Sequence, residues 1–353
     1  MSTKLPARLR ALGLGLGVSR SILHGTRATT TALATHIHTT AARSQRTRSP
    51  RRDPVPHVDK CPEPQCACEP APGDLEIDRK GNLRGAFVPY AQHVLVCTGK
   101  DDWASRVEEE EGAAGDVVRG LKGVFGRGGK FCDPYHNVSV LASSFPSPGP
   151  DPAVYLLPSF KYIPSLPPTP SALADFAKGH LLPQDLHPMH DALPEEDRRR
   201  LTLDPSLAVA TGAVPLDDVV VLICGHGGRD VRCGVMGPLL SSKFEEVLAS
   251  DGVPAAEDAP GGRRAEGEVR SRVGRISHIG GHKFAGNVIV YVPPHMRLRG
   301  GEGKHPLAGC GVWYGRVEPR HVEGIVRETV WGGRVIGELF RGGIDSEGRM
   351  LDI

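Results

Sequence analysis

The sequence predicts an α/β protein, and its second half carries the clearest signals. Residues 219–224, VVVLIC, form a continuous apolar and largely β-branched run, which is typical of a strand buried on both faces. Helical spacing of apolar residues follows at 238–250, with Pro238 in the expected first turn. Strands are predicted at 287–292 and 310–317, and a terminal helix at 321–333. The order β, α, β, β, β, α suits a thioredoxin-like α/β sandwich.

The first half repeats this pattern more weakly. Its predicted elements are a strand at 93–97, a helix at 103–111, and strands at 137–145 and 153–163. Each half has an apolar strand that ends in a cysteine, Cys97 or Cys224, and then a turn, a helix and two later strands. We therefore predict a smaller α/β domain here, either unrelated to the second or a degenerate thioredoxin-like copy of it.

Composition divides the chain of 353 residues further. The predicted segments are a targeting or disordered segment (1–52), a Cys/Pro-rich linker (53–75), an N-terminal α/β domain (76–165), a connector (166–216) that contains the helix-like run SALADFAKGHLL, and a thioredoxin-like domain (217–345).

The N-terminal segment is basic, rich in Ser and Thr, and free of acidic residues before Asp53. This composition is typical of a mitochondrial transit peptide, and the alternative is a disordered basic tail. Its apolar part is too short to span a bilayer, and no other stretch could do so. The net charge of +2 favours no nucleic-acid partner.

Eight cysteines occur, and a chain of this length does not need disulfides to fold. Cys61, Cys66 and Cys68 lie in the Pro-rich linker with the spacing C-x4-C-x-C, which matches no strong zinc pattern. They could bind a metal or form a disulfide. The others outside the motif described next, Cys97, Cys132 and Cys310, are more typical of core residues.

Two pairs of metal-binding residues stand out. Cys224 and Cys233 bracket a glycine-rich loop, CGHGGRDVRC, and His278 and His282 bracket two glycines in HIGGH. Each pair is next to a predicted strand end, and strand ends at one edge of an α/β sheet share a crevice. We therefore expect two thiolates and two imidazoles to meet around one metal centre, with His226 as the main rival ligand.

Cys2His2 suits zinc, and it also suits a 2Fe–2S cluster in which two histidines replace two cysteines on one iron. Eight residues between the cysteines are wide for a zinc knuckle and favour the larger cluster. We expect the N–H groups of Gly225, Gly227, Gly228 and Gly234 to face the sulfides, Gly280 and Gly281 to bend the histidine loop, and Arg229 and Arg232 to offset cluster charge.

These motifs resemble the sucrase/ferredoxin-like family, through CGHGGRDVRCGVMGP, SHIGGHKFAGNVIVY and WGGRVIGELF. CPEPQCACEP and LVCTGKDDWASRVEEE are similar to the altered inheritance of mitochondria protein 32 branch of that family. The resemblance covers about residues 60–345. It implies a thioredoxin-like ferredoxin domain with a 2Fe–2S cluster, held by Cys224 and Cys233 on one iron and by His278 and His282 on the other. It also implies mitochondrial residence, in the matrix or the intermembrane space, and gives His226 no ligand role.

No Ser/His/Asp set, phosphate loop or dinucleotide fingerprint is visible, so the sequence favours an electron-transfer or redox-sensing protein over an enzyme. A redox partner protein is implied but not identified. Two alternatives remain. One is a thiol–disulfide protein that uses Cys61, Cys66 and Cys68 or the pair Cys224 and Cys233. The other is a protein stabilised by structural zinc.

Overall fold

Two strands at the centre of the structure, β2 (Gln92–Cys97) and β7 (Val219–Cys224), are almost entirely buried, as their apolar sequences predict. The computed structural model describes residues 54–65, 68–262, 265, 267–300 and 303–353. The expected targeting segment, residues 1–52, lies outside the described residues. Within the described ranges, no helix has the length and apolarity that crossing a membrane requires.

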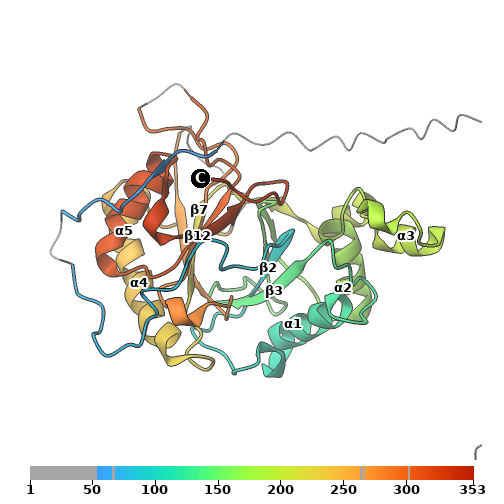
Figure 1. Cartoon of the computed structure of the whole chain (residues 1–353). Coiled ribbons are helices and arrows are strands. Elements are labelled where there is room, and N and C mark those ends of the chain that lie inside the picture. The colour runs from blue at the N-terminus through green and yellow to red at the C-terminus, as the bar shows by residue number, and fades with distance from the viewer. Residues whose placement is uncertain (1–53, 66–67, 263–264, 266, 301–302) are drawn as a thin grey trace, which may run out of the picture. The chain divides into compact units, whose positions relative to one another are not determined.

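β2 and β7 belong to one ten-stranded mixed sheet with the order β12-β10-β9-β7-β8-β3-β2-β4-β5-β6 (Figure 1). The other eight strands of this sheet are β3 (Val138–Ser143), β4 (Val154–Leu157), β5 (Lys161–Ile163), β6 (Val214–Pro215), β8 (Ser271–Ile276), β9 (Val288–Tyr291), β10 (Gly311–Tyr314) and β12 (Phe340–Ile344). The predicted α/β class is therefore confirmed.

The two halves of this sheet repeat one pattern. β2 pairs with β3 in parallel and with β4 antiparallel, and β4 pairs antiparallel with β5. In the second half β7, β8, β9 and β10 pair in the same way. The halves join where β3 meets β8, through the single antiparallel pair Ser143 and Ile276. The thioredoxin-like assignment and the division into two domains stay predictions.

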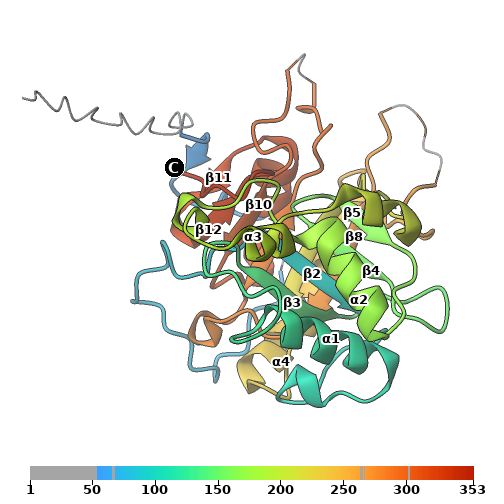
Figure 2. The ribbon, with the colours of Figure 1, turned by 90° about the vertical axis from the view of Figure 1, so that its right-hand side faces the viewer.

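Helices cover one face of each half. The α-helices among the described residues are α1 (Gly112–Phe125), α2 (Pro170–Phe176), α3 (Glu195–Leu201), α4 (Val231–Ser250) and α5 (Pro319–Ile325). Short 3-10 turns occur at Val107–Glu109, Pro188–His190, Pro205–Thr211, His282–Phe284 and Gly337–Leu339, and wider helical turns at Ala177–Leu181 and Val326–Trp331. α1 and α2 pack on the first half and α4 and α5 on the second, as the turned view also shows for α1 and α2 (Figure 2).

The helix predicted at 103–111 is wrong. Only the turn Val107–Glu109 lies there, and α1 begins at Gly112. The carbonyl groups of Trp103 and Ala104 accept hydrogen bonds from His226, so tertiary contacts use groups that a helix would pair internally. α1 contains four glycines, which weakened its helical signal.

Two further boundaries differ from the predictions. The strand predicted at 153–163 is a hairpin of β4 and β5, because Pro158 has no N–H group to continue the ladder. The helix predicted at 238–250 begins at Val231, so Pro238 lies inside α4. Asp230 causes the early start, because its side chain accepts the N–H of Arg232 as an N-cap.

The described part of the Pro-rich linker is attached to the second half. Its strand β1 (His57–Val58) pairs in parallel with β11 (Val335–Ile336). The N–H of Cys61 then donates to Glu338. A Cβ at Gly324 of α5 would lie 2.3 Å from the Cys61 sulfur, so this part of the linker packs closely on α5.

The face of the sheet that the helices do not cover is also buried, and there the two halves share one apolar core. Leu95 and Leu157 from the first half pack in the same cluster as Leu222 and Ile289 from the second. A polar network crosses this core and joins the halves. Tyr291 Oη hydrogen bonds to Tyr90 Oη (2.5 Å) and to His93 Nδ1 (2.9 Å), and Trp313 Nε1 donates to Tyr90 Oη (3.1 Å).

We expect His93 to make the protein acid-sensitive. Burial lowers the pKa of His93 from 6.5 to about 3. The unfolded chain therefore binds an additional proton between these values, and stability falls as the pH drops from about 6.5 toward 3. His93→Gln should reduce this loss by up to about 1.4 kcal/mol per pH unit, measured by urea unfolding across the pH range. His57→Gln, at an exposed histidine, is the control. Parallel stability profiles for wild type and His93→Gln would contradict the assignment.

Candidate metal centre

Cys224 and His278 come from neighbouring strands. Cys224 is the last residue of β7 and is paired in parallel with Ile276, the last residue of β8. His278 follows Ile276 by two residues. Because β7 and β8 run in the same direction, both side chains reach the same edge of the sheet. This placement agrees with the expected meeting of strand ends.

Cys233 reaches the same point from a helix. It lies in the first turn of α4, three residues after the N-cap Asp230, and not in the predicted loop. Its side chain is fully buried, and that of Cys224 is 1% exposed. Neither cysteine forms a disulfide.

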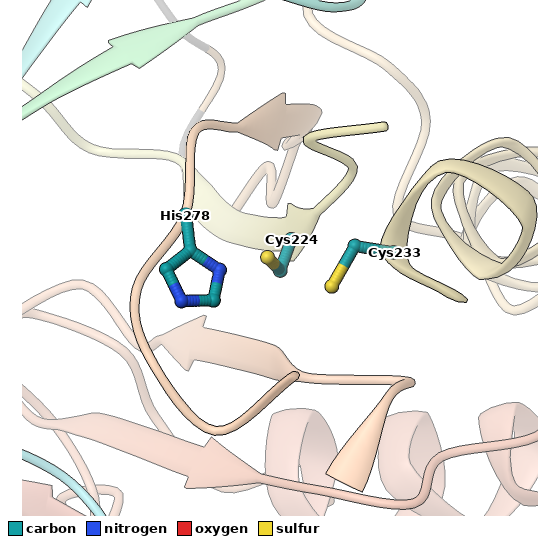
Figure 3. A group of neighbouring side chains, drawn as sticks. All are labelled: Cys224, Cys233 and His278. Carbon is teal, nitrogen blue, oxygen red and sulfur yellow. The ribbon is translucent and has the colours of Figure 1, made fainter. Parts of the chain in front are cut away.

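The three donor atoms of Cys224, Cys233 and His278 lie within 4.8 Å of one another. Figure 3 shows the side chains converging from the end of β7, the start of α4 and the loop after β8. It is the only such group of three or more metal-ligating side chains among the residues that the structure describes.

His282 is the fourth expected ligand and lies beside this group rather than within it. Its Nδ1 is 3.4 Å from His278 Nε2, and its side chain is 46% exposed. Gly280 and Gly281 have φ of +80° and +71°, so the expected glycine bend between the histidines is present. The Asp230 carboxylate lies 4.0 Å from the other ring nitrogen of His282.

The two thiols have opposite proton affinities. A hydrogen bond from Cys233 lowers the pKa of Cys224 well below its usual range, and His278 adds to this effect against the opposing cost of burial. The same hydrogen bond, together with burial, raises the pKa of Cys233. Cys224 therefore holds a thiolate readily, and a metal would have to displace the remaining proton from Cys233.

His226 is fully engaged in the protein and is not placed as a ligand. Its Nδ1 accepts the N–H of His278 (3.1 Å), so the ring proton is on Nε2. Nε2 donates to the carbonyls of Ala104 (2.9 Å) and Trp103 (3.2 Å). His226 thus connects the first half of the chain to the backbone of a candidate ligand.

The glycine N–H groups do not face the donor atoms as expected. Gly225 donates to Ile276, Gly227 to Gly225, and Gly234 to Asp230. Gly228 donates to the carboxylate of Asp102 in the first half. These glycines allow close packing instead, because a Cβ at Gly234 would lie 2.7 Å from the Cα of Gly227.

Asn287 and Arg341 are two site residues that the sequence analysis missed. Asn287 O accepts the N–H of Cys224 (3.0 Å), and its side chain donates to Gly281 O (3.0 Å), so it joins both ligand loops. Arg341 donates to Asn287 Oδ1 (2.6 Å). A single arginine in the otherwise apolar strand FRGGI was the available signal.

The other described cysteines lie apart from this group. Burial raises the pKa of Cys61 and of Cys97 to about 12, which makes both poor nucleophiles. Cys310 is fully buried, and Cys132 is half-buried. Cys66 lies outside the described residues. Arg232 pairs with Asp230 (2.8 Å) and its charge also acts to lower the pKa of Cys233, whereas Arg229 is exposed; that both offset cluster charge stays a prediction.

The donor set fits a bound metal or cluster. Thiolate and imidazole are the ligands of zinc and of iron–sulfur centres. His278 Nδ1 is buried without a hydrogen-bond partner, which is costly unless another group satisfies it. Two buried thiols beside this imidazole complete a set of three metal-ligating side chains.

We expect His226→Ala to weaken the site from a distance. It leaves two carbonyls and the His278 N–H without their partner, so the free energy of unfolding should fall by about 1–3 kcal/mol. Hydrogen exchange at the His278 amide should become faster. His187→Ala is a matched control, because His187 Nδ1 also accepts a backbone N–H (3.2 Å) but on an exposed turn. Unchanged protection of the His278 amide would contradict this role for His226.

The chain is similar to a known family and to several named proteins. The Sucrase/ferredoxin-like family matches residues 83–342. Three similar proteins bear the name "Altered inheritance of mitochondria protein 32". That of Debaryomyces hansenii is 31% identical, over 81% of this chain and 95% of its own length. That of Meyerozyma guilliermondii is 29% identical, over 83% and 97%. That of Clavispora lusitaniae is 44% identical, over 36% of each chain. No solved structure matches. The chain therefore belongs to the sucrase/ferredoxin-like family.

Proposed function

We propose that this chain is a mitochondrial 2Fe–2S protein that transfers electrons or senses redox state. Cys224 and Cys233 would hold one iron, and His278 and His282 the other. The observation that carries the proposal is the meeting of the two buried thiols with His278, within 4.8 Å, at the edge where His282 also lies. The ferredoxin-like family of the chain supports it.

The donors are arranged as two pairs of like ligands. The thiols of Cys224 and Cys233 share a hydrogen bond, and the rings of His278 and His282 have centroids 5.1 Å apart. A cluster whose two irons each take one pair suits this arrangement. Such a cluster supplies one-electron oxidation and reduction.

The ligands and the residues around them would have different roles at this centre. Cys224 and Cys233 would bind as thiolates in a place from which water is excluded. His282 lies at the exposed edge, so a redox partner would approach most closely on that side. Asp230, 4.0 Å from the outer nitrogen of His282, would orient this ring.

We also propose that both halves are thioredoxin-like and that they form two domains of a duplicated chain. The repeated order of parallel and antiparallel strand pairs supports this interpretation. Mitochondrial residence is supported by the name of the relatives and by the basic composition of residues 1–52. The chain would then bind its redox partner protein in the matrix or in the intermembrane space.

A second candidate is thiol–disulfide exchange by Cys224 and Cys233. Their closeness and the lowered pKa of Cys224 favour it. Complete burial of both thiols argues against it, because exchange needs access for another thiol. Structural zinc at the same four residues is a third candidate that the donor set permits.

Metal analysis of the full chain, purified without oxygen, distinguishes these candidates. We expect visible absorption with about two irons and two sulfides per chain, as a 2Fe–2S centre requires. Cys224→Ser should lose both. A colourless protein with stoichiometric zinc would refute the cluster. A colourless, metal-free protein with a titratable disulfide would favour thiol exchange.

Replacing His282 by cysteine tests the ligand itself. His282→Cys should retain the cluster and lower its reduction potential by on the order of 100 mV, because a thiolate donates more charge than an imidazole. Potentials from a spectroscopic redox titration provide the measurement. His295→Cys, at an exposed histidine in another part of the second half, should leave the potential unchanged. An unchanged potential in His282→Cys would remove His282 from the ligand set.

A further inference from the structure

Arg341 has the largest fully buried side chain of the described residues, and it lies close to the candidate centre. Arg341 is on β12 and is 1% exposed. Its Cζ lies 5.8 Å from the ring of Phe284 and 5.5 Å from that of Trp313. A Cβ at Gly281 would lie 2.4 Å from Arg341 Nη2, so the arginine packs directly under the histidine loop.

All hydrogen-bond acceptors of Arg341 are neutral. Nε and Nη2 donate to Ala86 O, and Nη1 donates to Asn287 Oδ1 (2.6 Å) and to Gly280 O (3.4 Å). No Asp or Glu among the described residues forms an ion pair with it. A buried charge without a partner of opposite sign is strongly destabilising. An anion held near this guanidinium would therefore stabilise the folded chain.

The negative charges that act on Arg341 are those of the candidate ligands. Burial lowers the pKa of Arg341 to about 10, and the charge of the Cys224 thiolate, joined by that of Cys233 once a metal displaces its proton, opposes this effect. The histidine loop that contacts Arg341 carries the other two expected ligands.

We propose that Arg341 is the fixed buried countercharge of the metal centre and that it raises the reduction potential of that centre. This inference rests on the proposed 2Fe–2S function. One-electron reduction adds one negative charge to the centre, and a cation held nearby at low dielectric stabilises that added charge. Arg341 thus acts as a positioning residue through its charge, and the neutral acceptors fix its place.

The competing explanation is purely structural. Through Asn287 and Gly280, Arg341 also holds the histidine loop, so its removal could shift the potential by moving a ligand. The two explanations differ in what a charge-preserving change does. Asn287→Ala removes the hydrogen bond to Gly281 O and one acceptor of Arg341, and it keeps the guanidinium charge, which still has Ala86 O and Gly280 O as acceptors.

A redox titration of the full chain at one fixed pH tests the inference. Arg341→Gln should reduce the equilibrium constant for reduction about tenfold, which is about 59 mV for a one-electron couple. Arg341→Lys, which keeps the charge, and Asn287→Ala, which keeps the arginine, should both stay closer to wild type. The electron paramagnetic resonance spectrum of each reduced variant reports whether the ligand set is retained.

Arg316→Gln is the matched control. Arg316 packs on the same Phe284 ring, with Cζ at 5.1 Å, but it has a carboxylate nearby, Asp78 Oδ1 at 3.8 Å. Because Asp78 offsets its charge, Arg316→Gln should shift the potential less than Arg341→Gln does.

The outcomes separate the two proposals. A wild-type chain without a cluster contradicts the proposed function. A cluster-bearing wild type whose potential does not respond to Arg341→Gln contradicts only the role of Arg341. An equal shift in Asn287→Ala also overturns it, in favour of loop geometry. If Arg341→Gln does not hold the cluster, Arg341→Lys provides the test. A tenfold change in its equilibrium constant for reduction, with the charge retained, would contradict the inference.

Discussion

The parallel pairing of β7 with β8 is the constraint on which the site depends. It brings Cys224 and His278 to the same edge of the sheet, although residues 225–277, which include α4, separate them in the chain. The helix between the strands is placed by Asp230, whose N-cap bond sets the position of Cys233. Three donors therefore converge through one strand pair and one cap.

The first half of the chain stabilises this arrangement without supplying a donor atom. Asp102 accepts the N–H of Gly228, and His226 spans from Trp103 and Ala104 to the backbone of His278. The shared apolar core and the hydrogen-bond network around Tyr291 hold the two halves together. Ordering a glycine-rich loop costs much conformational entropy, and these contacts compensate for that cost.

Much of this organisation could be predicted from the sequence where a pattern is local. The run VVVLIC predicted β7, and the motifs CGHGGRDVRC and HIGGH predicted the meeting of Cys224, Cys233 and His278, whereas His282 lies beside this group. Elements that depend on tertiary contacts could not be predicted. The helix expected at Trp103 is absent because His226 engages the carbonyls there, and α4 starts early because of a single cap. The apolar run FRGGI indicated that Arg341 could be buried, but only the structure shows that its hydrogen-bond acceptors are neutral.

The repeated topology has an evolutionary consequence. The loop after β2 occupies in the first half the position that the cysteine loop after β7 occupies in the second, and the two loops contact each other through Asp102 and Gly228. One half bears the donors, and the other half supports them through hydrogen bonds. Selection on the centre therefore extends to residues of the half that contributes no donor, such as Asp102.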